Sequence, residues 1–510
     1  MNNKKNKKNL IRECVRALSQ NKAALFAGAG LSIPSGGISW PTLLESEAKA
    51  IGIDAHKEHD LTSVAQYIYN ESGSRQIITR LLKNHINTHG KENDNHRIIS
   101  SLPIHKIWTT NYDDYIEQSL QKNNKIIDVK KSVEDMTSEV ENASTTVYKM
   151  HGDIGSLTNT VILKDDYEIY DRKNELFINA LQNDLMNNTF LFFGFSFDDP
   201  NLQNILSKVR IMLGDTGRRH YCILKEVSIN DEEFKDMINS DKEKAYEYRK
   251  NMQLLKVKDL ERYGIHAVLV KSFEEMTDIL KSIRNHYLAN TIFISGAYEK
   301  IDNFLGYDAD VGMDAANEFI RELGARLHEA NYNVKSGFGL GVGRNLIQGF
   351  LNEDAKRGNN KLSRTLTIHP FPSNLDEKEK HNYRQNIMEG AGISIILFGN
   401  KQNPKKKNEF ILSNGIEDEY IVAVEKGQLV IPVGLTGYMA QEIWKKIPRF
   451  TRVTEMNRLL EKLNDDSFIY NENMDRDEKI EYLIDIIFEI LDLYQNNIDA
   501  IHYDLNSILN

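Results

Sequence analysis

Cysteine is scarce in this chain of 510 residues, which contains two: Cys14 and Cys222. A structural zinc site built on four thiolates is therefore not available. A disulfide framework is excluded for the same reason, and proteins without one are typical of reducing compartments. We expect a cytoplasmic location.

Long apolar runs and an excess of basic residues are also missing. No stretch approaches the ~18 apolar residues of a membrane span. The first nine residues, MNNKKNKKN, lack the apolar segment of a secretory signal and are expected to form a frayed tail. Lys and Arg number 64 against 74 Asp and Glu, for a net charge of −10. This balance argues against nucleic acid as the main partner, and we expect no membrane partner either.

The length of the chain indicates two domains, because a single core rarely organises so many residues. An amphipathic helix expected over 273–287 could close the first domain, and a new apolar run, TIFIS, begins at Thr291. We place the two domains at residues 1–286 and 287–510. No repeat of 20–50 residues is visible.

Short apolar runs that end in glycine or polar residues recur along the first domain. Such runs predict buried strands, and their repetition predicts a doubly wound parallel sheet. Helical periodicity at 61–69 and 77–86 predicts helices added beside it. The second domain repeats the strand-and-turn pattern, so the predicted fold is α/β, with two Rossmann-like parallel-sheet domains in tandem and added helices in the first. The runs of the first domain lie at 23–30, 107–113, 146–153, 190–201, 220–224 and 267–270.

Gly28-Ala29-Gly30 follows the first apolar run, and a helix with its clearest part at 40–51 is expected after it. Glycine permits positive φ and has no Cβ to block a ligand. Free backbone N–H groups at such a turn can cradle a phosphate. The dinucleotide fingerprint has a third glycine where this chain has Ile33, so a tight strand–helix turn explains the stretch about as well.

Polar residues follow two other predicted strands. Asn111 and Asp113 come after the run at 107–110, and His151 comes after the run at 146–150. Ligands bind beyond the carboxyl ends of parallel strands, so these side chains are candidates to face one crevice. Histidine titrates near neutral pH and is the commonest general base. The alternatives are a helix cap at Asn111 or Asp113 and a structural histidine at His151.

Four motifs, in this order and at this spacing, resemble the sirtuin (SIR2) superfamily. They are GAGLS at 28–32, TTNYD at 109–113, HGD at 151–153 and GFSFDDP at 194–200. The resemblance covers roughly residues 10–285 and implies an NAD-binding domain that acts at the nicotinamide–ribose bond. It implies a catalytic pair, Asn111 and His151. It also implies NAD-binding positions at Gly28, Ala29, Gly30, Ser32, Asp113, Gly194 and Ser196.

The chain departs from protein-deacylating sirtuins, which carry a four-cysteine zinc module beside the acyl-peptide cleft. That absence puts deacylation in doubt but leaves NAD cleavage. Nicotinamide departs from NAD as a neutral base, so no general acid is needed. An asparagine amide can orient a ribose hydroxyl or a water, and a neutral imidazole can take the proton. NAD is thus expected as the substrate, and no metal is required.

In the second domain, four glycines alternate after a strand predicted at 332–335, in SGFGLGVG at 336–343. A ligand-binding loop is favoured over a flexible loop, because a strand precedes it and a helix is expected at 345–352. Further strand-plus-turn units are expected at 366–372, 393–401 and 429–438.

This half resembles the SLOG superfamily of nucleotide-binding domains, in the branch fused to SIR2 or TIR partners. The PGGxGT motif of catalytic SLOG enzymes is absent, which favours a sensor. The resemblance implies phosphate contacts at Ser295, Gly296, Gly337, Phe338 and Gly339. We place His369, Arg384, Asn400, Lys401 and Glu409 in the rest of the pocket. The guanidinium of Arg384 could pair bidentately with phosphate, and a solvated helix charge explains it equally.

The order SIR2 then SLOG is similar to that of the effectors of Thoeris anti-phage systems. This implies that a TIR-domain partner makes a cyclic ADP-ribose isomer, which binds the SLOG domain and releases the SIR2 domain to deplete NAD. It also implies a homo-oligomer, a tetramer or larger. An amphipathic helix at 475–495 could serve assembly, although packing on its own domain is favoured.

Three functions therefore remain for the chain. A regulated NAD glycohydrolase is the prediction. An NAD-dependent protein deacylase is disfavoured by the missing cysteines, and a catalytically silent nucleotide-binding scaffold is disfavoured by Asn111 together with His151.

Overall fold

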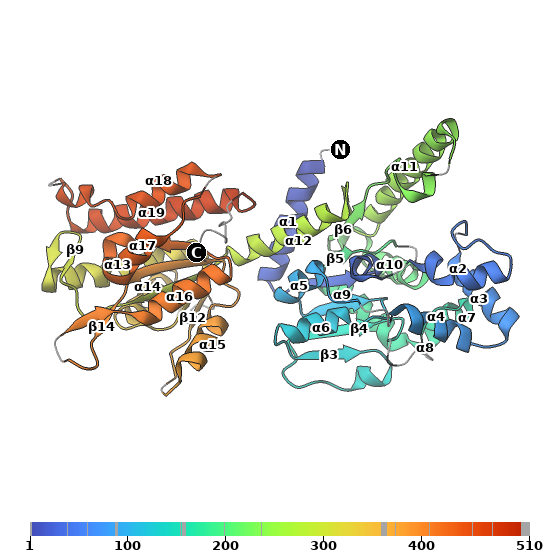
Figure 1. Ribbon diagram of the computed structural model, residues 1–510, viewed down its shortest axis with the longest axis horizontal. Helices are drawn as coiled ribbons and strands as arrows, with labels where there is room; N and C mark the ends of the chain where they lie inside the picture. Colours follow the sequence, from blue (N-terminus) through green and yellow to red (C-terminus); the bar gives the residue numbers. More distant parts are fainter. Residues whose placement is uncertain are drawn as a thin grey trace. The chain divides into compact units, whose positions relative to one another are not determined.

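The chain divides into two compact units, Met1–Arg284 and Asn285–Asn510, which we call the first and second unit (Figure 1). The structure is a computed structural model. It describes residues 3–37, 39–58, 60–86, 90–153, 155, 160–197, 199–235, 237–358, 365–372, 374–406, 409–450, 452–471 and 473–500.

A parallel sheet of seven strands forms the centre of the first unit, in the order β3-β4-β2-β1-β5-β6-β7. Its strands are β1 Ala23–Ala27, β2 Lys106–Thr109, β3 Ile127–Lys130, β4 Thr145–Lys149, β5 Thr189–Phe193, β6 His220–Lys225 and β7 Ile265–Val270. The helices are α1 Asn3–Ser19, α2 Trp40–Ala50, α3 Leu61–Ser72, α4 Gln76–Ile86, α5 Asp94–Ser101, α6 Tyr115–Lys122, α7 Lys164–Glu168, α8 Tyr170–Lys173, α9 Glu175–Asn187, α10 Pro200–Leu213, α11 Asn239–Glu261 and α12 Phe273–Leu288. The last turn of α12 belongs to the second unit.

Two clusters of buried residues, described here among those of this unit, lie in different parts of it. One face of the sheet packs on α9 and α10, with Phe26, Trp108 and Phe192 among its buried residues. A smaller core lies within α2, α3 and α4, which gather with α7 at one end of the unit (Figure 1). Buried apolar area is the main favourable term in folding, so this second cluster explains why the added helices are stable beside the sheet.

The second unit is built on a parallel sheet of five strands, in the order β12-β11-β8-β13-β16. Its strands are β8 Thr291–Ala297, β11 Asn333–Ser336, β12 Leu366–Ile368, β13 Ile393–Phe398 and β16 Leu429–Pro432, and two antiparallel pairs join β9 Asn303–Phe304 to β10 Tyr307–Asp308 and β14 Asn400–Gln402 to β15 Phe410–Leu412. The helices are α13 Ala309–Glu329, α14 Val342–Lys356, α15 Glu377–Ile387, α16 Asn414–Glu425, α17 Tyr438–Lys446, α18 Thr454–Lys462 and α19 Arg476–Asn497.

Alternation along β8 shows how the second unit forms three layers. Ile292 and Ile294 point into the core shared with α13, α14, α18 and α19, whereas Phe293 lies in the core shared with α15, α16 and α17. Successive side chains of a strand point to opposite faces, so a strand apolar at every position is buried on both faces. The apolar face of α19 lies in the first of these cores.

The predicted α/β class, with two parallel sheets in tandem and added helices, is confirmed. One local expectation is wrong, and one strand was missed. Residues 3–9 belong to α1 and do not form the expected frayed tail. The edge strand β3 was not expected, because its sequence IDVK alternates with polar residues and has no apolar run. Among the described residues, no helix is long and apolar enough to span a bilayer.

Candidate active site and nucleotide pocket

Four segments of the first unit begin together at the carboxyl edge of the sheet. Ala27 is in register with Thr109 on one side and with Phe193 on the other, and Thr109 is in register with Lys149. These are the last residues of β1, β2, β4 and β5, so the segments that follow them share one edge. The chain order reverses around β1, which lies between β2 and β5, and ligands of open α/β sheets bind at such a switch point.

The glycine turn after β1 packs directly against the turn after β5. A Cβ on Gly28 would lie 2.5 Å from the oxygen of Gly194, and one on Gly30 would lie 2.8 Å from the Cα of Gly194. The N–H groups of Gly28 and Gly30 donate to Phe193 O (3.0 Å) and Gly194 O (2.8 Å). A phosphate would have to compete for these two N–H groups, so the tight turn accounts for both glycines and the expected free-amide cradle is not formed by them.

Two 3₁₀ turns, at Ala29–Leu31 and Ile33–Ser35, lie between Gly28 and the expected helix, which is α2. Pro34 lies in the second turn, and Gly36 ends it with a φ of +88°. This left-handed conformation favours glycine and stops a helix. The α-helix begins only at Trp40, where the Ser39 side chain accepts from Thr42 N.

The side-chain nitrogen of Asn111 is fixed by the glycine turn. It donates to Gly28 O and to Ser32 Oγ, both at 3.1 Å, and the side chain is buried. Because a carbonyl oxygen only accepts, the NH₂ group must face Gly28, and the amide oxygen points the other way. Asn111 does not cap α6, whose N-cap residue is Asp114.

Asp113 lies close to Ser32. Burial raises the pKa of its carboxyl, although hydrogen bonding to Ser32 and the charge of Lys149 lower it in part. The carboxylate also accepts from Tyr115 N at 3.4 Å. Ser32 therefore joins Asn111 and Asp113 in one polar group beside the glycine turn.

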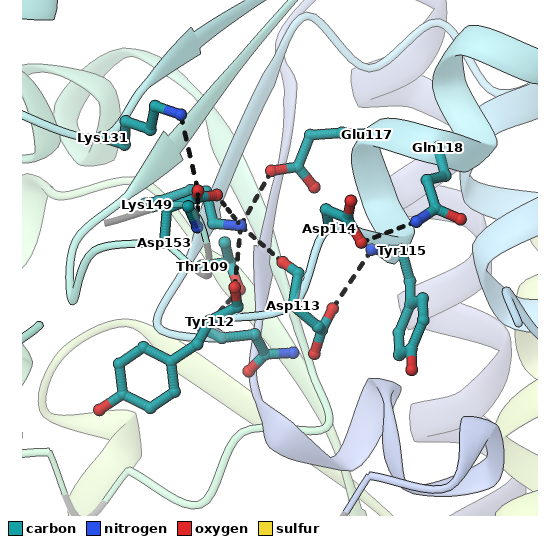
Figure 2. A network of polar contacts seen from close by, with 12 residues as sticks. Thr109, Tyr112, Asp113, Asp114, Tyr115, Glu117, Gln118, Lys131, Lys149 and Asp153 are labelled. Carbon is teal, nitrogen blue, oxygen red and sulfur yellow. Dashed lines mark hydrogen bonds and ion pairs between the residues drawn. The ribbon is translucent and has the colours of Figure 1, made fainter. Parts of the chain in front are cut away.

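Lys149, the last residue of β4, links the segments after β2 and β4 (Figure 2). Its ammonium group is fully buried and lies 2.9 Å from Asp153 Oδ2 and 3.0 Å from Glu117 Oε1. It also donates to the main-chain oxygens of Asp113 (2.5 Å) and Tyr112 (3.4 Å). Burial tends to lower the pKa of this lysine, but the charges of Glu117 and Asp153 outweigh it and raise the pKa. The lysine stays charged and holds both segments.

His151 is 3% exposed, and its Nε2 atom lies 3.0 Å from Asp199 Oδ2. The other carboxylate oxygen of Asp199 accepts from Leu202 N at 2.9 Å and caps α10. Burial raises the pKa of Asp199, but the contact with His151 and the backbone N–H groups outweigh it and hold the pKa below its usual value. The sequence reasoning did not single out Asp199. The signal was available, because an aspartate before Pro200 after a strand is typical of a helix cap.

The remaining predicted NAD-binding residues lie in the same segments. Ala29 begins the first 3₁₀ turn, Gly194 has a φ of +64°, and Ser196 is exposed two residues further on. Within the described part of the chain, no group of three or more His, Cys, Asp or Glu side chains could hold a metal ion.

In the second unit, the two predicted glycine loops touch each other. A Cβ on Gly339 would lie 1.9 Å from the oxygen of Gly296, so only glycine fits there. Tyr298 N donates to Leu340 O at 2.9 Å and joins the loops again. Phe338, between the glycines, has a φ of +60° and is 43% exposed.

A buried acid that the sequence reasoning missed lies next to these loops. Glu419, on α16, accepts from Ser295 Oγ at 2.5 Å and lies 3.7 Å from the position of a Cβ on Gly337. Burial raises its pKa to about 7, although Ser295 and Arg384 lower it in part. The sequence EDEY at 417–420 gives no reason to choose Glu419 over the acidic residues beside it. Its hydrogen-bond partner, Ser295, is 124 residues away in the chain.

Arg384 is buried beside the same group, so the solvated-charge alternative is wrong. Its guanidinium carbon lies 4.9 Å from the centroid of the Phe371 ring, and Nη1 lies 3.2 Å from Asp418 Oδ2. Its Nε is buried with no hydrogen-bond partner among the described residues. A buried donor without a partner is unusual, and a ligand that accepts a hydrogen bond would satisfy it.

The other predicted pocket residues have varied surroundings. His369 follows β12, and burial lowers its pKa. Asn400 accepts from Glu299 N at 2.9 Å and donates to Lys300 O at 2.6 Å, so both ends of its amide hold the segment after β8. Lys401 lies in the β14–β15 hairpin. Glu409 is exposed beside that hairpin and accepts from Asn403 at 2.7 Å.

Comparisons with known proteins match domain families to both halves of the chain. Residues 105–250 match the SIR2-like domain, and residues 275–494 match the Sir2- and TIR-associating SLOG family. The NAD(+) hydrolase ThsA of Enterococcus faecium is 40% identical over 447 residues, which cover 86% of this chain and 90% of that protein. ThsA of Bacillus cereus (strain MSX-D12) is 36% identical, over 95% of this chain and 98% of that protein. Defense-associated sirtuin 2 of Bacillus subtilis is 28% identical over 43% of this chain and 23% of its own length.

The fold and these matches define a protein with a SIR2-like domain followed by a SLOG domain. More narrowly, identity of 35–40% over most of both chains shows the family: the chain belongs to the ThsA NAD(+) hydrolases.

Proposed function

We propose that this chain hydrolyses NAD to nicotinamide and ADP-ribose at the carboxyl edge of the first sheet. One observation carries the proposal. Asn111 and His151 each lie two residues beyond a registered pair, Thr109 and Lys149, on adjacent parallel strands. The oriented amide of Asn111 and the imidazole of His151 therefore follow the same edge of the sheet, beside the glycine turn.

The chemistry needs few protein groups. Nicotinamide leaves as a neutral base, so the site has to stabilise an oxocarbenium-like ribose and activate a water. The amide oxygen of Asn111 is available to accept from a ribose hydroxyl or from that water, because the amide nitrogen is held by Gly28. His151 takes the proton of the water as general base.

The NAD site we propose includes the glycine turn and its neighbours. Because the N–H groups of Gly28 and Gly30 are already bonded, these glycines contribute by letting the turn after β1 pack closely on the turn after β5, which shapes this edge of the sheet. Ser32 and Asp113 supply polar groups next to Asn111. The full set is Gly28, Ala29, Gly30, Ser32, Asp113, Gly194 and Ser196, with Asn111 and His151 as the catalytic pair.

We further propose that the second unit senses a cyclic ADP-ribose isomer made by a TIR-domain protein. Ser295, Gly296, Gly337, Phe338 and Gly339 border the pocket, and the unpartnered Nε of Arg384 favours an anionic ligand. Glu419, which contacts Ser295, fits this pocket better than the exposed Glu409. His369, Asn400 and Lys401 remain candidates at its rim.

In this proposal the ligand activates NAD hydrolysis, and the resulting loss of NAD defends the cell against phage. The ligand must bind the active state better than the inactive one, typically by ~1–3 kcal/mol. The active form is proposed to be a homo-oligomer, a tetramer or larger.

One assay separates the candidate functions. Purified protein is given NAD with and without cyclic ADP-ribose isomers, and nicotinamide and ADP-ribose are measured. Release of both without any peptide supports the hydrolase, turnover only with an acyl-peptide supports a deacylase, and no turnover supports a silent scaffold. His151→Ala should abolish cleavage while ligand binding in the second unit is retained, and persistent cleavage would contradict the catalytic assignment.

A further inference from the structure

Asp199 is the one carboxylate that joins His151 to a helix in the described structure of the first unit. One oxygen accepts from Leu202 N at the start of α10, and the other lies 3.0 Å from His151 Nε2. The two side chains are 8% and 4% exposed, so little water screens the contact. The helix cap fixes the carboxylate, and its second oxygen lies close to Nε2, a buried atom that makes no other hydrogen bond among the described residues.

We propose that Asp199 is a positioning residue for NAD hydrolysis, which keeps the imidazole of His151 in one orientation with its proton on Nε2. The inference rests on the proposed function. A carboxylate beside one nitrogen of a histidine selects the tautomer and leaves the other nitrogen as the base. Nδ1 then receives a proton from the attacking water, whose oxygen forms a bond to the ribose carbon. The bond from that carbon to nicotinamide breaks with its electron pair going to the pyridinium nitrogen, and the imidazolium later returns its proton to solvent.

The other titratable groups around His151 do not replace Asp199. The rings of Tyr167 and Tyr170 meet the imidazole edge-on, at 5.5 and 6.4 Å between centroids. Burial raises the pKa of both tyrosines, so they stay neutral at physiological pH. A third tyrosine, Tyr112, has its pKa raised by burial in the same way.

The neighbouring charges are already paired with each other. Both carboxylate oxygens of Asp166 accept hydrogen bonds from the guanidinium of Arg75, a bidentate pair with distances of 3.0 and 2.8 Å. At the end of the strand that precedes His151, the charge of Lys149 is balanced by Asp153 and Glu117. Asp199 is therefore the charged group in direct contact with the imidazole.

A substitution can separate the two roles of Asp199. Asparagine and serine are as good as aspartate at a helix N-cap, but they carry no charge. Asp199→Asn and Asp199→Ser thus keep the cap of α10 and remove the carboxylate. Asp60→Asn is the matched control, since Asp60 caps α3 through Ser63 N at 3.0 Å and contacts no histidine among the described residues.

The experiment measures NAD cleavage by the full chain as a function of pH, with circular dichroism to verify folding. In Asp199→Asn we expect kcat to fall roughly 10- to 100-fold, the effect typical of losing such a partner, with little change in KM. Asp60→Asn should match the wild type in both kcat and KM.

Several outcomes would overturn the inference. An Asp199→Asn protein whose kcat and KM coincide with those of the wild type would show that the carboxylate acts only as a cap. Failure of both Asp199 variants to fold, with Asp60→Asn folded, would assign Asp199 to stability alone. Active His151→Ala protein would instead refute the proposed function, which makes the two failures distinguishable.

Discussion

The side-chain nitrogen of Asn111 donates to the carbonyl oxygen of Gly28 at 3.1 Å, across 83 residues of sequence. This bond ties the segment after β2 to the turn after β1. It also decides which end of the amide is available to a substrate, because the carbonyl of Gly28 can only accept. The amide oxygen is thereby presented as an acceptor.

Replacement of Asn111 by aspartate tests that orientation. A carboxylate has nearly the same shape but no N–H to donate, so it would face the Gly28 oxygen with like partial charge. We expect Asn111→Asp to lower kcat by roughly 10²–10³, the range typical of losing an oriented polar group in an active site. Nicotinamide release from NAD measures the effect. Wild-type turnover by this variant would contradict the assigned role.

The buried lysine between the two catalytic segments gives a prediction about stability. Lys149→Met leaves Glu117 and Asp153 buried without their shared cation, and breaking a buried ion pair costs about 3–5 kcal/mol. Lys131 contacts the same Asp153 from the surface at 3.5 Å, so Lys131→Met should cost about 0–1 kcal/mol. Urea unfolding of the full chain measures both. Equal losses would show that Lys149 contributes no more than a surface charge.

Most strands of both sheets could be predicted because buried parallel strands are continuous apolar runs, as in FLFF at 190–193. The edge strand β3 could not, since only alternate residues of IDVK are buried. The start of α1 was missed because its first turns are polar, and α1 is held instead by packing of later residues such as Leu10 and Leu18.

Long-range partners limit what the sequence could reveal about the sites. Strand ends placed Asn111 and His151 at one edge, since parallel strands share their carboxyl ends. The pairing of His151 with Asp199, and of Ser295 with Glu419, depends on how distant segments pack. For the same reason the glycine turn looked like an open cradle, although Gly194 fills the space beside it.

The close contact between the loops of Gly296 and Gly339 in the second unit predicts that one added methyl group weakens ligand binding. In Gly339→Ala the new Cβ would lie 1.9 Å from the backbone oxygen of Gly296, so the loops must separate. We expect binding of a cyclic ADP-ribose isomer to weaken at least about tenfold, by calorimetry, which corresponds to about 1.4 kcal/mol. Gly217→Ala is the control, because its Cβ would meet its nearest neighbour at 3.8 Å. Unchanged binding in Gly339→Ala would place the ligand elsewhere.

The buried carboxyl of Glu419 predicts a stability that depends on pH. Its pKa rises from the ordinary value of 4.5 to about 7 in the folded chain, mainly through burial. Between these two pH values the folded state binds more protons than the unfolded state, so the free energy of unfolding falls as the pH rises. Above about pH 7 the carboxyl is ionised in both states, and the full cost of burying the charge remains. Glu419→Gln cannot ionise but can still accept from Ser295. It should therefore stabilise the protein by about 3 kcal/mol at pH 8 and by nothing below pH 4.5.

Denaturant unfolding of Glu419→Gln and of the wild type at pH 4.5, 6, 7 and 8 measures this difference. Glu409→Gln is the control, because Glu409 is exposed and its contact with Lys406 lies on the surface. We expect the control to follow the wild type at every pH. A gain for Glu419→Gln that is the same at pH 4.5 and 8 would mean that the carboxyl does not titrate in this range. A stability gain that grows between pH 4.5 and 7 would show that the buried carboxyl of Glu419 titrates in this range. A ligand in this pocket would then have to supply a partner for the charged carboxylate or bind while the carboxyl is protonated.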